Sequence, residues 1–227
     1  NAFREKRPKT KSLERMVKTL SNRLNLKINF ESIATHKLSE TMQALSEITN
    51  IDWLVLGWNG RAYNGIFFNN PIGWIVSHIN SNFALFKCNG VMRFNKVLLA
   101  IRPNSRDTVK LIETTNKLCK YYNAEFTLLH VVPADISIEQ VNNIKLKAND
   151  LLKGTKGNLL LVPSENPIDT VSDLTAEHDL LVIGTPRKDT WAVGFATKKN
   201  EGEIRDKTNR ELINVFVPTT PNPTSGF

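Results

Sequence analysis

Two stretches of the chain share one pattern: Asp179-Leu180-Leu181-Val182-Ile183-Gly184 and Asp52-Trp53-Leu54-Val55-Leu56-Gly57. Each is an apolar run between an aspartate and a glycine, which is typical of a strand covered by helices on both faces. The two stretches lie 127 residues apart, and the elements on either side of them correspond in order. Correspondence over four consecutive elements favours an internal duplication over chance similarity of two buried strands.

Helices and strands alternate outward from these stretches. Around Asp52–Gly57, the stretch nearer the N-terminus, the pattern predicts a helix from Ser12 to Leu24, a strand at 26–33, helices at 36–48 and 71–79, and a strand at 83–88. Around the second, it predicts strands at 96–101, 125–132, 158–162 and 214–217 and helices at 106–122, 137–152, 168–177 and 200–212. This alternation predicts an α/β protein with a mainly parallel sheet.

The duplication is incomplete. Shifting the second repeat back by 127 residues places its opening strand, helix and strand before residue 7, so the first repeat lacks them. We therefore expect a partial unit over residues 1–93, a complete unit over 94–219 and a disordered tail over 220–227. The start at Asn1 rather than Met leads us to expect a fragment or a processed product.

The repeated pattern resembles the universal stress protein family, whose units are βαβαβαβαβ domains with an Asp-x-aliphatic-Val-aliphatic-Gly fourth strand. The resemblance implies tandem Rossmann-like units with a parallel sheet in the order 3-2-1-4-5. In the first unit only strands three, four and five are present, so strand three has no neighbour. Unpaired strand backbone is costly when buried, and we expect upstream sequence or a partner to supply the missing strands.

ATP-binding members of the family carry an acidic residue after strand one, and after strand four Gly-x-x-Gly, nine residues and then Gly-Ser/Thr. Such glycines let backbone N–H groups approach a phosphate. The first unit retains Gly57 and Gly60, but Asn70 and Pro71 stand where Gly-Ser/Thr belongs. We interpret Gly57, Gly60 and Asn70 as a degenerate nucleotide loop. The alternative is a flexible turn with no ligand.

The second unit departs further from the nucleotide-binding pattern. It keeps Gly184, but Arg187 replaces the second glycine, and Arg102 stands where the acidic residue is expected. An arginine cannot accept hydrogen bonds as a carboxylate does. We therefore expect no bound cofactor, with ATP or AMP in the first unit as the alternative.

Nothing in the sequence indicates catalysis or a metal site. The four histidines lack metal-binding spacing, the two cysteines form no Cys-x-x-Cys pair, and no Gly-x-Ser-x-Gly elbow occurs. His130 lies in an apolar strand and is expected to pack there. Two cysteines cannot form a disulfide framework, and no apolar run of about 18 residues occurs to span a bilayer.

The net charge of +8 is a local property. Residues 1–27 carry nine basic and two acidic side chains, and the other 200 residues have a net charge of only +1. A solvated helix face is the ordinary explanation, and proximity to anionic lipid is the alternative. No aromatic residues beyond Phe3 interleave with the basic run, so we expect no nucleic-acid partner.

Two functions fit these observations. Val55–Arg61 resembles the degenerate tandem units appended to transporters of the amino acid–polyamine–organocation superfamily. That resemblance implies a non-catalytic regulatory and dimerising domain on the cytoplasmic side of a bacterial or archaeal amino-acid permease or cation–chloride cotransporter. It also implies a homodimer paired through the last strands, at Phe83–Cys88 or Asn214–Val217. The alternative is a free-standing tandem stress protein that binds an adenine nucleotide. The sequence names neither a transported substrate nor a regulatory signal.

Overall fold

The computed structural model describes residues 8–48, 51–58, 82–87, 91, 93–101, 108–184 and 211–216. The chain forms two compact units, Asn1–Thr41 and Met42–Phe227. The predicted helix 71–79 and the tail 220–227 lie outside the described residues.

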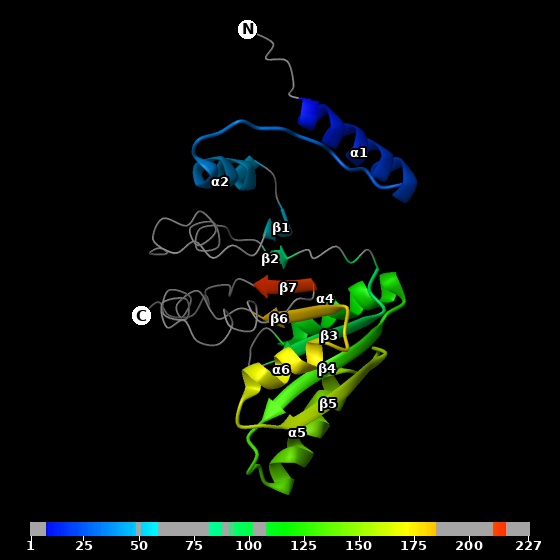
Figure 1. Ribbon diagram of the computed structural model, residues 1–227, viewed down its shortest axis with the longest axis vertical. Coiled ribbons are helices and arrows are strands. Elements are labelled where there is room, and N and C mark those ends of the chain that lie inside the picture. The colour runs from blue at the N-terminus through cyan, green and yellow to red at the C-terminus, as the bar shows by residue number, and fades with distance from the viewer. Residues whose placement is uncertain are drawn as a thin grey trace, which may run out of the picture. The chain divides into compact units, whose positions relative to one another are not determined.

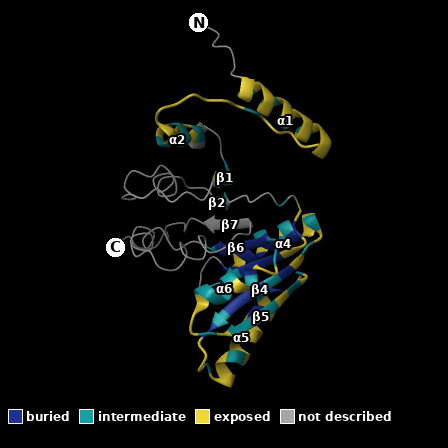
Figure 2. Ribbon diagram, viewed as in Figure 1, coloured by how far each residue is buried: buried dark blue, intermediate teal, exposed yellow. Residues whose placement is uncertain are grey.

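The N-terminal unit contains helix α1 (Pro8–Leu24), which has no buried residue. Its apolar stripe follows the predicted helical spacing, yet the large apolar side chains on it are exposed: Leu13, Met16, Leu20 and Leu24. In Figure 2 this helix is coloured mostly as exposed. Asn25 ends the helix in the left-handed region at φ 50°, and Leu26 N donates to Ser21 O at 3.0 Å. After glycine, asparagine is the residue that adopts this helix end most readily.

The predicted strand at 26–33 is wrong, because these residues lie in no strand. Leu26 is 57% exposed and Ile33 46% exposed. A strand needs a neighbour to satisfy its backbone donors and acceptors, and no described strand pairs with this segment. These residues therefore do not form the strand three that the resemblance implies.

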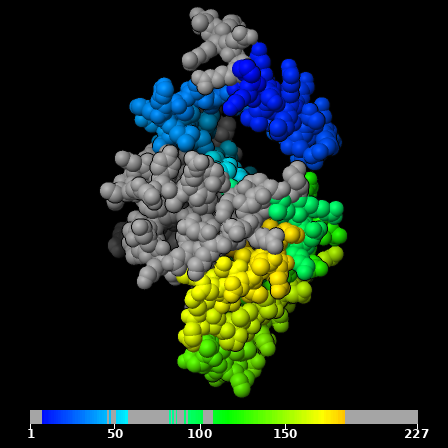
Figure 3. Space-filling model, viewed as in Figure 1, coloured from blue at the N-terminus to red at the C-terminus, as the bar shows by residue number. Residues whose placement is uncertain are grey.

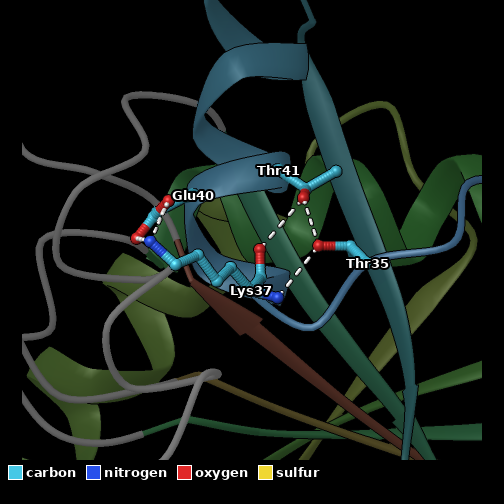
Figure 4. Close-up of polar contacts among 4 residues, drawn as sticks. All are labelled: Thr35, Lys37, Glu40 and Thr41. Atoms are coloured by element: carbon cyan, nitrogen blue, oxygen red, sulfur yellow. Dashed lines mark hydrogen bonds and ion pairs between the residues drawn. The ribbon is translucent and has the colours of Figure 1, made fainter.

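Helix α2 (Leu38–Ile48) begins with a set of polar contacts drawn in Figure 4. Lys37 N donates to Thr35 Oγ1 at 2.9 Å, and Thr41 Oγ1 lies 2.9 Å from both Thr35 Oγ1 and Lys37 O. Lys37 Nζ also pairs with Glu40 Oε1 at 2.9 Å. Threonine hydroxyls favour such positions because they satisfy backbone groups that the first helical turn leaves unpaired.

The compact unit Met42–Phe227 is built on one seven-stranded sheet (Figure 1). Its strands are β1 (Trp53–Trp58), β2 (Asn82–Lys87), β3 (Lys96–Ile101), β4 (Glu125–Val132), β5 (Gly157–Pro163), β6 (Leu180–Gly184) and β7 (Glu211–Phe216). Three described helices alternate with the strands from β3 onward: α4 (Thr108–Tyr122) follows β3, α5 (Ile138–Leu151) follows β4, and α6 (Pro167–Thr175) follows β5. Residues 211–212, predicted as the end of a helix, belong to β7 instead; the rest of that predicted helix lies outside the described residues.

The strand order is β1-β2-β7-β6-β3-β4-β5. Within the second repeat, β5-β4-β3-β6-β7 is the predicted order 3-2-1-4-5, and every pair in it is parallel. β1 and β2 are the fourth and fifth strands of the first repeat and are also parallel. The prediction of a tandem α/β fold with this sheet order is therefore confirmed.

The last strands of the two repeats pair with each other. β2 runs antiparallel to β7, with Phe83 opposite Phe216 and Lys87 opposite Leu212. Both strands therefore have neighbours on each side within one chain. The prediction that either last strand offers a free edge for a homodimer is wrong, because the duplication has placed the matching edge in the same polypeptide.

The core of the compact unit Met42–Phe227 lies on the two faces of its sheet. On one face, strand residues such as Val97, Leu99 and Phe126 pack with buried residues of α4 and α5. On the other, Leu98 and Leu181 pack with Val171 of α6. Alternate residues of the same strands thus supply opposite faces, which explains their continuous apolar runs. Figure 2 shows these strands as the buried part of the chain.

Candidate functional site at the carboxyl ends of the strands

β3 and β6 are neighbours, but the chain continues from β3 to β4 on the opposite side of it. Ligands of open α/β sheets bind where the strand order reverses in this way, beyond the carboxyl ends of the strands. Ala100 lies opposite Ile183, and one residue later the strands end at Ile101 and Gly184. This is the position at which the resemblance places a nucleotide.

Gly184 is closely packed there against a core side chain. A Cβ atom on Gly184 would lie 2.8 Å from Cδ1 of Leu111, a side chain of α4 that is only 1% exposed. Normal carbon–carbon contacts are 3.5–4.0 Å, so any larger residue would have to displace a core side chain. The glycine of the second stretch is therefore explained without a phosphate.

Gly57 is its counterpart in the first repeat and has a different environment. It lies in β1, next to the strand's last residue, and is exposed. A Cβ atom on Gly57 would have no neighbour within 4 Å, so packing does not require a glycine at this position. The other predicted loop residues, Gly60 and Asn70, lie outside the described residues, as do Arg102 and Arg187, so the nucleotide loop stays a prediction.

His130 is the buried titratable group nearest the carboxyl end of β4. It lies opposite Ile101 of β3 and Leu161 of β5, is 8% exposed, and its Nε2 has no hydrogen-bond partner among the described residues. Burial lowers the pKa of His130 below its usual value of 6.5. The ring is therefore neutral at pH 7 and packs in the core, as its apolar strand predicts.

Asp179 has a role that the sequence did not reveal. Its Oδ2 accepts hydrogen bonds from the backbone N–H groups of Asn95 at 2.7 Å and Lys96 at 3.1 Å. The aspartate at the start of one strand thus holds the leading end of the neighbouring strand β3. The aspartate opens both copies of the repeated stretch, which was a signal for this role.

Other potential functional groups are dispersed. Among the described residues, no three His, Cys, Asp or Glu side chains gather to hold a metal ion. Burial raises the pKa of the Cys119 thiol to about 11, so it is not a nucleophile at neutral pH. Among the described residues, a surface hollow of about 370 Å³ is lined by Lys11, Glu14, Arg15 and Lys18 of α1, the helix drawn in dark blue in Figure 3.

Comparison of the sequence with known proteins gives two matches. Residues 168–225 match the family described as "Protein of unknown function (DUF502)". Over 175 residues, 74% of its length, the chain is 23% identical to the Na(+)/H(+) antiporter NhaS5 of Synechocystis sp.. The chain spans about a quarter of that protein, since the match covers 24% of the antiporter. In the described part of the chain, no helix has the length and apolarity to cross a bilayer.

Solved structures resemble the chain over most of its length. A universal stress protein from Archaeoglobus fulgidus matches 90% of this chain and 76% of its own, with 13% identity and a TM-score of 0.62. The cytoplasmic domain of a prokaryotic cation chloride cotransporter matches 94% of this chain and 81% of its own, with 14% identity and a TM-score of 0.61. The chain therefore has the universal stress protein fold, a Rossmann-like α/β fold.

Proposed function

We propose that this chain is a regulatory, non-catalytic domain on the cytoplasmic side of a bacterial or archaeal secondary transporter. The observation that carries the proposal is the similarity to the antiporter, which extends over 175 residues of this chain but only 24% of the antiporter. A chain of this fold that corresponds to a minor part of a transporter is expected to be attached to membrane helices encoded elsewhere in the polypeptide.

The type of transporter is a finer part of the proposal. The resemblance found in the sequence implies that the transporter is an amino-acid permease or a cation–chloride cotransporter. Similarity to a sodium–proton antiporter and to the cytoplasmic domain of a cation chloride cotransporter supports a cation transporter over an amino-acid permease. The excess of basic side chains in residues 1–27 agrees with a cytoplasmic segment near a membrane, under the positive-inside rule.

The absence of catalysis is also a proposal. It is supported by the burial of Cys119, a candidate nucleophile, and of His130, a candidate base, both in the second repeat. Cys119 is 4% exposed and its pKa is raised, and His130 is 8% exposed and its pKa is lowered. Neither is accessible to a substrate, and a group that acts on a substrate has to reach it.

The test is to follow the protein and the transport in membranes. An antibody raised against the α5 peptide should detect, in native cells, a membrane-bound polypeptide much larger than 25.7 kDa. In inverted membrane vesicles, deleting residues 1–227 should change how cation flux responds to pH or ionic strength while leaving a measurable flux. A 25.7 kDa product in the soluble fraction would contradict the proposal.

The second candidate is a free-standing tandem stress protein that binds an adenine nucleotide. Gly57 favours it, because an exposed glycine with open space around it lets a ligand approach the backbone. Calorimetric titration of the chain with ATP separates the candidates. We expect no saturable heat, and binding with a micromolar Kd that Gly57→Val abolishes would favour the second candidate.

A homodimer remains part of the proposal, with an interface that does not involve β2 or β7. Light scattering at tens of micromolar should give twice the monomer mass. A monomer at that concentration would remove dimerisation from the proposed function.

A further inference from the structure

Helix α1 has two sides of opposite chemistry. Four apolar side chains at intervals of three or four residues share one side and are called here the α1 stripe: Leu13, Met16, Leu20 and Leu24. Lys11, Arg15 and Lys18 are spaced by the same intervals and, at about 100° per residue, lie on the opposite side of the helix. The helix is therefore amphipathic, with a basic polar side.

The unit Asn1–Thr41 does not itself cover the α1 stripe. No residue of α1 is buried, and the side chains of the stripe are 37–63% exposed. Leu26 and Ile28 are exposed beside the end of the helix, where their backbone N–H groups donate to Ser21 O at 3.0 Å and Ser21 Oγ at 3.4 Å. Single exposed apolar side chains are ordinary, whereas a group of them on one side marks an interaction surface.

The same helix concentrates positive charge. It carries five basic side chains and one acidic one, Glu14, and so has a net charge of +4 over 17 residues. For charge alone, a solvated helix face is the ordinary explanation. A solvated helix gains nothing from an exposed apolar side, so that explanation does not account for the α1 stripe. The helix offers a partner both positive charge and apolar surface.

An anionic lipid bilayer matches both properties, because its headgroups attract basic side chains and its hydrocarbon takes up apolar ones. Helices with Lys and Arg on the polar side and low overall hydrophobicity lie in the plane of the membrane interface. A nucleic acid would neutralise the charge but leave the α1 stripe in water. A second copy of α1 would cover the stripe but bring together two helices that each carry a charge of +4.

We propose that α1 binds an anionic lipid bilayer directly and lies in its headgroup region, with the α1 stripe toward the hydrocarbon. Lys9 lies one turn before Leu13, and Arg23 lies one turn after Leu20. Long basic side chains in such positions bury their stems and extend their charged ends to the lipid phosphates. The basic side chains on the opposite side of the helix face water.

This inference goes beyond the proposed function, because it names the bilayer itself as a partner of the unit Asn1–Thr41. It does not rest on the proposed function, since a free chain and a chain attached to a transporter would bind lipid through the same helix. The experiment below contains no transporter. Its failure would therefore leave the proposed function untouched.

Flotation of the purified chain with lipid vesicles tests the proposal. We expect the chain to bind phosphatidylcholine vesicles that contain phosphatidylglycerol at least about tenfold more tightly than vesicles of phosphatidylcholine alone. Raising the NaCl concentration from about 0.1 M to about 1 M shortens the Debye length from about 10 Å to about 3 Å. Binding to the anionic vesicles should weaken at least about tenfold over that range.

Two double variants separate the apolar and the charged contribution. Leu13→Gln with Leu20→Gln should weaken binding to anionic vesicles about 100-fold, because two leucine side chains no longer enter the hydrocarbon. Lys9→Gln with Arg23→Gln should weaken it about 20-fold, at about fivefold for each charge lost. Glutamine is a good helix former and α1 buries no residue, so circular dichroism should show both variants folded.

Helix α5 supplies matched controls. Ile138→Gln with Leu146→Gln removes two apolar side chains that are 80% and 70% exposed. Lys145→Gln with Lys147→Gln removes two exposed charges. Both control variants should bind anionic vesicles as tightly as the original chain.

A fluorophore that reports its environment tests the orientation of α1. In a Cys88→Ser background, a label on Met16→Cys should shift to the blue when anionic vesicles are added. A label on Asn22→Cys, on the opposite side of the helix, should not shift.

Four results would overturn the proposal. They are equal binding to vesicles with and without phosphatidylglycerol, full binding by the Leu13→Gln, Leu20→Gln variant, and an equal loss of binding in the α5 controls. The fourth is a dimer of the chain without lipid, seen by light scattering, that the Leu13→Gln, Leu20→Gln variant dissociates, because a second copy would then cover the α1 stripe.

Discussion

The contact between Gly184 and Leu111 predicts a double-mutant cycle that separates packing from ligand binding. In Gly184→Ala the new Cβ would lie 2.8 Å from Leu111 Cδ1, about 0.7–1.2 Å closer than a normal carbon–carbon contact. Leu111 is 1% exposed and is packed among core residues, so it has little room to move. Overpacking of this kind costs about 1–3 kcal/mol, and we expect the free energy of unfolding to fall by that amount.

Truncating Leu111 should remove the clash. Leu111→Ala alone should cost about 2–5 kcal/mol, because it opens a cavity in the core. In the double variant the added methyl group enters that cavity, so the loss should be smaller than the sum of the single losses by about 1–3 kcal/mol. Urea unfolding followed by circular dichroism measures all four proteins.

Gly57→Ala is the matched control. It makes the equivalent change in the first repeat, where a Cβ atom has no neighbour within 4 Å. We expect a change between zero and a stabilisation of about 1 kcal/mol, from the reduced entropy of the unfolded chain. Additive losses for Gly184 and Leu111, or equal losses for the two glycine variants, would refute the packing explanation.

Three further predictions concern the second repeat. Burial lowers the pKa of His130 below 6.5, so below that pH the unfolded chain binds a proton that the folded chain excludes. The contribution of His130 to stability should therefore be complete above about pH 6.5 and fall below it. Urea midpoints at pH 7.5, 6.5 and 5.5 measure this slope, and the same slope in a His130→Leu variant would contradict the prediction. Burial raises the pKa of the Cys119 thiol from 9.0 to about 11. In a Cys88→Ser background at pH 8, Cys119 should therefore react with a disulfide reagent roughly 100-fold more slowly in the folded than in the urea-unfolded protein. Equal rates in the two states would show that burial does not protect the thiol. Ser137→Ala should lower stability by about 0.5–2 kcal/mol, because it removes the capping box with Gln140 at the start of α5, and Ser137→Thr should retain most of it in the same urea assay.

The strands were predictable where they are buried on both faces. β3 and β4 have the bounds that the apolar runs predict, because a strand between two helical layers has no polar face to interrupt its pattern. The sheet order followed from the family resemblance and the repeat, since periodicity alone carries no information about which strands are neighbours. The helix 36–48 was also found, two residues early.

Errors arose where the structure depends on what lies beside a segment. Residues 26–33 have the composition of a strand, but they lie in no strand, and a local pattern cannot show whether a neighbouring strand is there to pair with them. Ile138 has the spacing of an inward-facing residue of α5, yet it is 80% exposed, in the first turn of that helix. Residues 211–212 continue a charged, helix-favouring stretch, yet the pairing of β7 with β6 and β2 starts at residue 211 or 212 and overrides that preference.

The candidate site was predictable only as a position. The carboxyl ends of β3 and β6 follow from the strand order. The reason for a glycine there did not, because Gly184 and Gly57 look alike in sequence, whereas in the structure Leu111 packs against Gly184 and nothing packs against Gly57. The strand contact of Asp179 depends on two backbone N–H groups 83 and 84 residues away in sequence.

The antiparallel pairing of β2 with β7 changes how the assembly responds to dilution. When two separate chains pair through their last strands, the fraction paired falls as the protein is diluted. Here both strands belong to one chain, so their encounter is unimolecular and is governed by an effective concentration that the covalent connection sets. Duplication has therefore converted an interface that would depend on expression level into one that persists in a single molecule.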